Sequence, residues 1–256
     1  MDFTLAIGLV SLGLLLGMLL FVELGRRIGA RRLAQDAEGA RAGVGAVEGA
    51  VFALLGLLLA FTFSGAASRF DTRRHLVVEE ANAIGTAYLR LDLLPAETQP
   101  ALRELFRNYV DARLEIYRKL PDIAAAKAEL DRATALQGEI WSKAVSAGKG
   151  SQPATMLLLP ALNQMIDITT TRTATTLMHP PPIIFAMLAI LALAASMLIG
   201  YSAAGSKTRN WLHIAGFAAI MTVTVYVIAE IEFPRLGLIR VDAIDQLLVE
   251  VRKGMN

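Results

Sequence analysis

The feature that most constrains this chain is a stretch of 47 residues, from 48 to 94, that contains no proline. Its apolar residues do not alternate as a half-buried strand requires. Pro95 ends the stretch, because the residue before a proline is disfavoured in the helical region. As one helix the stretch spans about 70 Å, whereas the hydrocarbon core of a bilayer is only about 30 Å thick. We therefore predict a helix whose first half crosses a membrane and whose second half stands in water.

The charged side chains of this stretch are distributed as the prediction requires. Residues 50–67 include none, and seven titratable side chains follow: Arg69, Asp71, Arg73, Arg74, His75, Glu79 and Glu80. The polar half also carries an apolar seam at steps of four and three: Val77, Ala81, Ile84, Tyr88 and Leu91. Such a seam is typical of a helix that packs in a bundle. The helix is therefore expected to join a membrane span to an extramembrane helical bundle.

Composition excludes several classes of protein. With 55% hydrophobic residues and a mean hydropathy of +0.50, the chain of 256 residues is not an ordinary soluble domain. The absence of cysteine removes disulfides and thiolate metal sites, and a formal net charge of +2 is too small to indicate nucleic acid. The common hydrolase and nucleotide-binding motifs are missing from the sequence. We expect no enzyme activity, no cofactor, no metal and no nucleic-acid partner.

The remaining hydrophobic and helical patterns predict an all-α membrane protein with four transmembrane helices. A helical bundle is expected between the second and third of them. The first apolar run, 3–24, is interpreted as a retained span, because it lacks a basic n-region and is long enough to cross the bilayer. The expected organisation has four parts: 1–67 with two spans and an Arg-rich connecting loop, 68–182 with the extramembrane bundle, 183–232 with the third and fourth spans, and 233–256 with a turn and a short helix.

The basic residues of the short connections indicate an orientation. The two short loops contain seven Lys and Arg: Arg26, Arg27, Arg31, Arg32, Arg41, Lys207 and Arg209. Short loops govern orientation more strongly than long domains do, so these loops are predicted to be cytoplasmic and the bundle to lie outside the cytoplasm. Five arginines at the other ends of the spans oppose this prediction: Arg69, Arg73, Arg74, Arg235 and Arg240.

Residues 61–82, FTFSGAASRFDTRRHLVVEEAN, resemble the segment that leaves the pore helix in bestrophin chloride channels. The positions that carry this resemblance are Phe61, Ser64, Arg69, Arg74, Leu76 and Asn82. The whole chain is similar to bacterial proteins grouped as bestrophin-like, which share the four spans, the helical insert and a tail like FPRLGLIRV. The resemblance implies a homopentamer in the bacterial inner membrane, with the second spans ringing a pore. With the orientation above, the bundle is then periplasmic.

Two faces of the second span are candidates for the pore. Leu54, Leu58, Phe61 and Gly65 lie on one face and can form an apolar constriction that gates by dewetting, with Thr62 beside them as a further pore-lining residue. A neighbouring stripe of small residues allows close helix approach: Gly56, Ala60, Ser64 and Ala67. The alternative interpretation is that both stripes are packing or lipid-facing surface.

Charged residues at the two ends of this span are candidates for the pore mouth. Arg69 and Arg73 are one turn apart with Arg74 beside them, and in a closed ring they would form a basic collar that attracts anions. The alternative is that they pair with nearby carboxylates or mark the membrane interface. Glu48 begins the span, where a carboxylate favours the helix N-terminus, and it is equally a candidate cation or proton site. Glu230 and Glu232, at the end of the fourth span, are also candidates for a cation or proton site.

These observations lead to one main hypothesis and two alternatives. The main hypothesis is a homopentameric anion channel, with chloride as the expected ion and the second span as the pore lining. The alternatives are a non-conducting scaffold or sensor whose bundle binds a partner, and a cation-conducting channel. The expected partners are further copies of the chain, small inorganic ions and membrane lipid.

Overall fold

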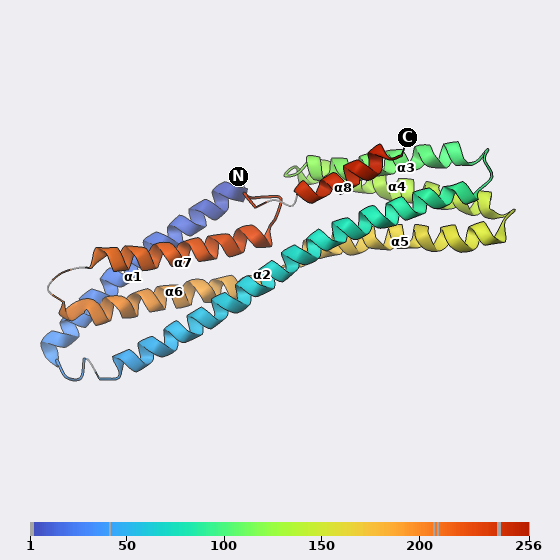
Figure 1. The fold of residues 1–256 in the computed structure, drawn as a ribbon. Helices are drawn as coiled ribbons and strands as arrows, with labels where there is room; N and C mark the ends of the chain where they lie inside the picture. Colours follow the sequence, from blue (N-terminus) through green and yellow to red (C-terminus); the bar gives the residue numbers. More distant parts are fainter. Residues whose placement is uncertain (1–2, 41, 207, 209, 240–241, 256) are drawn as a thin grey trace. The chain divides into compact units, whose positions relative to one another are not determined.

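In the computed structural model, the protein is described over residues 3–40, 42–206, 208, 210–239 and 242–255. Every regular element in these ranges is helical, which confirms the predicted all-α class. Arg41, Lys207, Arg209 and Arg240, which enter the orientation argument, lie outside the described residues. The elements in chain order are α1 (Phe3–Gln35), α2 (Val44–Leu89), η1 (Arg90–Leu93), α3 (Gln99–Arg118), α4 (Ile123–Gly148), α5 (Gln152–Leu177), α6 (Pro182–Ser202), η2 (Ala203–Gly205), α7 (Trp211–Glu232) and α8 (Asp242–Lys253) (Figure 1).

α2 confirms the unbroken helix predicted from the sequence. It begins four residues earlier than expected, at Val44, and continues without a break through Ser68 to Leu89. The last turn before Pro95 tightens into the 3₁₀ helix η1, a common way for a helix to end. The chain divides into two compact units, and α2 contributes to both, since the boundary falls between Arg69 and Phe70.

The first unit comprises the chain up to Arg69 together with His179–Phe233, and therefore contains α1, the first part of α2, α6 and α7. Four segments of the described chain are long and apolar enough to cross a membrane: Phe3–Gln35, Val44–Leu93, Gln152–Gly205, which includes α6, and Trp211–Glu232. This agrees with the four predicted spans. Met18, Leu55, Leu188 and Ala218 are among the buried residues of the shared core.

Two glycines allow α1 and α6 to pack closely. A Cβ atom added at Gly25 would lie 1.9 Å from the carbonyl oxygen of Met197, and one added at Gly200 would lie 1.9 Å from that of Val22. Only glycine lets the two backbones approach this closely, as small residues do at many membrane-helix interfaces. Gly29, one turn beyond Gly25, is also buried on this face of α1.

α1 is longer than its apolar run, because most of the arginine-rich connection is helical. The segment after Leu24 contains good helix formers, and basic residues near a helix C-terminus interact favourably with the helix dipole. The chain then turns at Asp36, whose Oδ1 accepts hydrogen bonds from the backbone N–H groups of Glu38 and Gly39.

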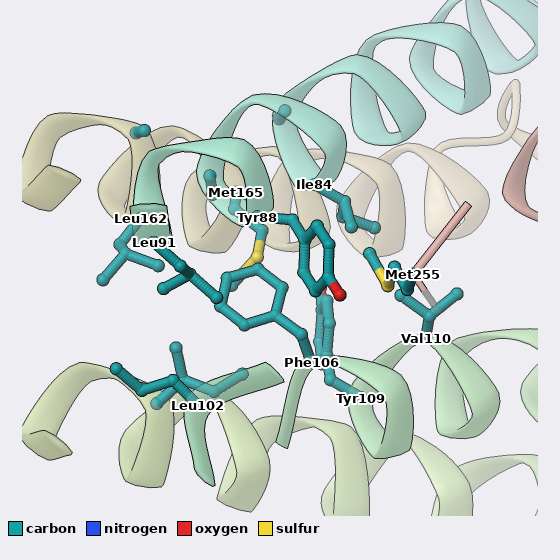
Figure 2. Close-up of a cluster of buried hydrophobic side chains, with 14 of the residues drawn as sticks. Ile84, Tyr88, Leu91, Leu102, Phe106, Tyr109, Val110, Leu162, Met165 and Met255 are labelled. Carbon is teal, nitrogen blue, oxygen red and sulfur yellow. The ribbon is translucent and has the colours of Figure 1, made fainter. Parts of the chain in front are cut away.

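The second unit is a helical bundle formed by Phe70–Met178 and Pro234–Asn256. Its core joins α2, α3, α4, α5 and the C-terminal segment, and the labelled side chains of Figure 2 meet there. All five residues of the predicted seam of α2 are buried, which confirms that seam: Val77, Ala81, Ile84, Tyr88 and Leu91. Asp122 and Ser151 cap α4 and α5 by accepting hydrogen bonds from Ala125 N and Ala154 N.

Candidate pore helix and its charged residues

The predicted gate residues of α2 divide between two sides of the helix. Leu54 is 47% exposed and Phe61 is 66% exposed, so both project away from the rest of the chain. Leu58 and Gly65 are half-buried. Thr62 is buried, and its hydroxyl donates to the Leu58 carbonyl oxygen at 2.7 Å. Leu54 and Phe61 are therefore exposed on the surface of the chain, whereas Thr62 packs inward.

The small residues of the span lie mostly on the exposed side. A Cβ atom at Gly56 would meet no heavy atom within 4 Å. Ala60 and Ser64 are exposed, and Ala67 is half-buried. This side of α2 therefore has room for another helix to approach.

Arg69 is held by a carboxylate that the sequence did not indicate as its partner. Its Nε and Nη2 donate to Glu232 Oε2 at 2.9 and 2.6 Å, and Nε also lies 3.1 Å from Oε1. The Nδ1 atom of His179 is 3.0 Å from Glu232 Oε1, and its ring stacks on Phe233 with centroids 4.3 Å apart. Glu232 is completely buried. The Arg69 guanidinium therefore neutralises the buried carboxylate of Glu232 within the first unit, which contains α1, the first part of α2, α6 and α7.

The other two predicted collar residues differ in exposure. Arg73 is buried and donates from Nη2 to the Met178 carbonyl oxygen at 3.1 Å. Arg74 is exposed, 3.4 Å from Asp71 Oδ1, which is one of the local pairings expected from the sequence. Glu79, further along the same helix, is also exposed.

Glu48, at the other end of the span, makes a specific contact between helices. Its Oε2 accepts a hydrogen bond from the hydroxyl of Ser202, the last residue of α6, at 2.9 Å. The carboxylate therefore joins α2 to α6 as well as lying in the first turns of α2, where a negative charge is favourable. Among the described residues, no group of three or more His, Asp or Glu side chains is arranged to hold a metal ion.

The bundle contains a buried charge cluster, which we call the Glu80 cluster. It consists of five charged side chains and one aromatic ring: Glu80, Arg113, Arg172, Arg235, Asp245 and Tyr117. Glu80 Oε1 accepts from Arg113 Nε at 2.5 Å, and its Oε2 accepts from Arg172 Nη1. Burial alone would raise the pKa of the Glu80 carboxyl, but the two guanidiniums outweigh it and hold that pKa below its usual value.

The C-terminal segment completes the Glu80 cluster. Asp245 Oδ1 accepts from Arg172 Nη2 at 3.2 Å, and both oxygens accept from Arg235, at 2.6 and 2.9 Å. The Tyr117 ring lies 4.2 Å from the guanidinium carbons of both Arg172 and Arg235. Arg235 has a φ of 114°, a region that non-glycine residues rarely adopt, and its two bonds to Asp245 stabilise that conformation. The cluster therefore fixes the tail to α2, α3 and α5.

A second buried polar group lies in the middle of the bundle. The hydroxyl groups of Tyr109 and Thr169 are 2.9 Å apart, and Gln137 Nε2 donates to both at 3.1 Å. Burial raises the pKa of Tyr109 to about 12, so the phenol stays protonated and can act as a donor. The three side chains join α3, α4 and α5.

Together the four spans, the bundle and the long shared helix define a multi-pass helical membrane protein. Residues 11–244 match the family model for the Bestrophin-like domain, so the chain belongs to the bestrophin-like family. This confirms the resemblance seen in the sequence.

Solved structures support the same fold. A crystal structure of a bacterial bestrophin homologue from Klebsiella pneumoniae, carrying a tryptophan-to-alanine mutation, matches with a TM-score of 0.69 at 15% identity and 96% coverage of both chains. A leucine-to-threonine variant from the same organism matches with a TM-score of 0.64 at 15% identity, covering 94% of this chain and 97% of that one. No curated protein matches this chain in sequence.

Proposed function

We propose that the chain assembles as a homopentamer that conducts ions through a pore lined by the membrane span of α2. The observation that carries this proposal is the exposed side of that span. Leu54, Leu57, Phe61 and Phe63 all project from the subunit, whereas Leu55, Thr62 and Ala66 face inward. Of the four candidate spans, the one in α2 is the least buried within the described chain, at 6% of its most apolar window.

Several copies are needed because a four-span subunit of this size encloses no pore of its own. In a ring, Leu54 and Phe61 supply an apolar constriction, and the open space at Gly56 admits the neighbouring helix. The family to which the chain belongs supports this choice over a non-conducting scaffold. We place the protein in the bacterial inner membrane with its short loops in the cytoplasm.

Anion conduction is the first candidate for the selectivity of the pore. The charges of α2 favour cation conduction as the second candidate. Arg69 is paired with Glu232 and Arg73 is buried, so neither presents a free cation on the helix surface. The exposed charges of this part of α2 are Asp71, Arg74 and Glu79, two negative side chains against one positive. A ring with this balance attracts cations rather than anions, and cation conduction is therefore the second candidate.

Planar-bilayer recording of the purified protein tests conduction, and the reversal potential across a potassium chloride gradient decides between anions and cations. Native mass spectrometry counts the subunits. No current at any polarity or pH, or an assembly too small to surround an axis, would favour the scaffold and overturn the proposal.

Labelling of a Lys149→Cys variant by an impermeant maleimide in intact cells tests the orientation, because Lys149 is exposed in the bundle.

Cysteine substitution tests the pore lining, since the natural sequence contains no cysteine to interfere. A charged thiol reagent should reduce the current of a Phe61→Cys channel at least several-fold. The matched control is Leu212→Cys on α7, which is 81% exposed in the subunit and belongs to a different span. If both variants respond alike, or neither does, α2 does not line the pore.

A further inference from the structure

The end of α1 carries a row of arginines beside its membrane span. α1 runs as one helix from Phe3 to Gln35, and its glycines at positions 25 and 29 are buried against α6. The exposed arginines after the span therefore lie on its other faces: Arg27, Arg31 and Arg32. Because the glycine contacts hold this part of the helix close to α6, the arginines are presented on a rigid support rather than on a loop.

Most of this charge is not neutralised within the subunit. Glu23 accepts hydrogen bonds from Arg26 at 3.3 Å and from Arg27 at 2.9 Å. Arg31 and Arg32 form no ion pair with any residue in the described part of the chain. Asp36, one turn after Arg32, accepts backbone hydrogen bonds instead. The segment therefore presents at least two guanidiniums to an outside partner.

A shallow groove lies beside the same end of α1. Its lining includes the apolar side chains of Leu19, Val22 and Ile214, the ion-paired Glu23 and Arg26, and Trp211. Trp211 is the first residue of α7 and is 56% exposed, a typical place for tryptophan at the level of the lipid headgroups. Glu23 and Arg26 balance one another in the groove, so the excess positive charge at this end of α1 comes from Arg31 and Arg32. Apolar side chains next to this charge fit an amphipathic molecule better than a free ion.

We propose that this groove and the arginines beside it bind an anionic phospholipid. The guanidiniums at the end of α1 face its phosphodiester group, and an acyl chain lies along Leu19, Val22 and Ile214. The choice of occupant follows from charge complementarity, because clusters of basic residues next to a membrane helix attract anionic headgroups. The proposal does not depend on ion conduction.

Native mass spectrometry of the full-length protein in detergent tests this inference. The protein is mixed with phosphatidylglycerol or with phosphatidylcholine of the same acyl chains, and the bound lipid is measured. The natural protein should retain phosphatidylglycerol in preference. An Arg31→Gln/Arg32→Gln variant should show that preference reduced about 30-fold, since it lacks two basic residues near the headgroups.

The matched control is Arg118→Gln/Arg132→Gln, which removes two exposed arginines from the bundle and leaves the groove unchanged. This control should bind lipid as the natural protein does. Equal retention of the two lipids by the natural protein would overturn the proposal, as would an equal loss in both double variants. A rise in melting temperature with inorganic phosphate as large as that with phosphatidylglycerol would show a simple anion site and also overturn it.

Discussion

Replacing Glu80 by glutamine should destabilise the bundle strongly. The Glu80 carboxylate is completely buried and compensates two guanidiniums that are themselves almost entirely buried, Arg113 and Arg172. Removing one partner from a buried ion-pair network typically costs about 3–5 kcal/mol, because charge is left uncompensated where water cannot reach it. Arg172 keeps its bond to Asp245, so we expect the lower end of this range, about 3 kcal/mol.

Thermal unfolding of the detergent-solubilised protein, followed by circular dichroism, measures this effect. For a unit of this size, about 3 kcal/mol corresponds to a fall in Tm of roughly 10 °C. The control is Glu79→Gln at the neighbouring exposed position, which removes the same charge and should change Tm by no more than about 2 °C. Equal effects of the two substitutions would refute the reasoning.

The pH dependence of stability gives an independent test of the same ion pairs. The pKa of Glu80 is lower in the folded protein than in the unfolded chain, so the unfolded chain binds the proton first as the pH falls. The contribution of Glu80 is therefore fully present above the ordinary glutamate pKa of 4.5, and it is lost as the pH falls through the lower folded value. The Glu80→Gln variant should lack this part of the acid destabilisation. An unchanged acid profile in the variant would contradict the assignment.

Three further substitutions test other contacts by the same melting assay. Gly200→Ala should destabilise the membrane unit by about 1–3 kcal/mol because its Cβ overlaps the Val22 backbone, whereas Gly13→Ala, which meets no atom, should be neutral or slightly stabilising. Arg69→Gln should cost about 2–4 kcal/mol because it leaves the buried carboxylate of Glu232 without its bidentate partner, and Arg74→Gln on the surface should cost well under 1 kcal/mol. Tyr109→Phe should cost about 1–2 kcal/mol by leaving buried polar partners unsatisfied, and no measurable loss would argue against the network.

The parts of the fold that follow local rules could be predicted from the sequence. The continuity of α2 follows from the lack of proline and glycine clusters before Pro95, and the seam from Val77 to Leu91 follows from helical periodicity. These patterns depend only on neighbours along one helix. The close packing at Gly25 and Gly200 was not predicted, because a glycine in a helix shows no sign of which helix it will meet.

The charged contacts were harder to predict, because their partners are distant in sequence. Arg69 pairs with Glu232, 163 residues away, and not with the carboxylates on its own helix. The position of Glu80 in the sequence did indicate burial, since Glu80 falls on the apolar helix face that contains Val77, Ala81 and Ile84. A carboxylate on such a face needs a buried partner, but periodicity does not identify Arg113 or Arg172. The outward direction of Phe61 likewise depends on tertiary packing that one sequence does not reveal.

The position of Asp245 in the chain has a consequence for synthesis. The ribosome makes Glu80, Arg113 and Arg172 before the third and fourth membrane spans, and Arg235 and Asp245 only after both. Until then, Arg172 lacks its second carboxylate partner, and Tyr117 lacks the Arg235 guanidinium that lies over its ring. The Glu80 cluster is therefore completed only after the last membrane helix has been synthesised.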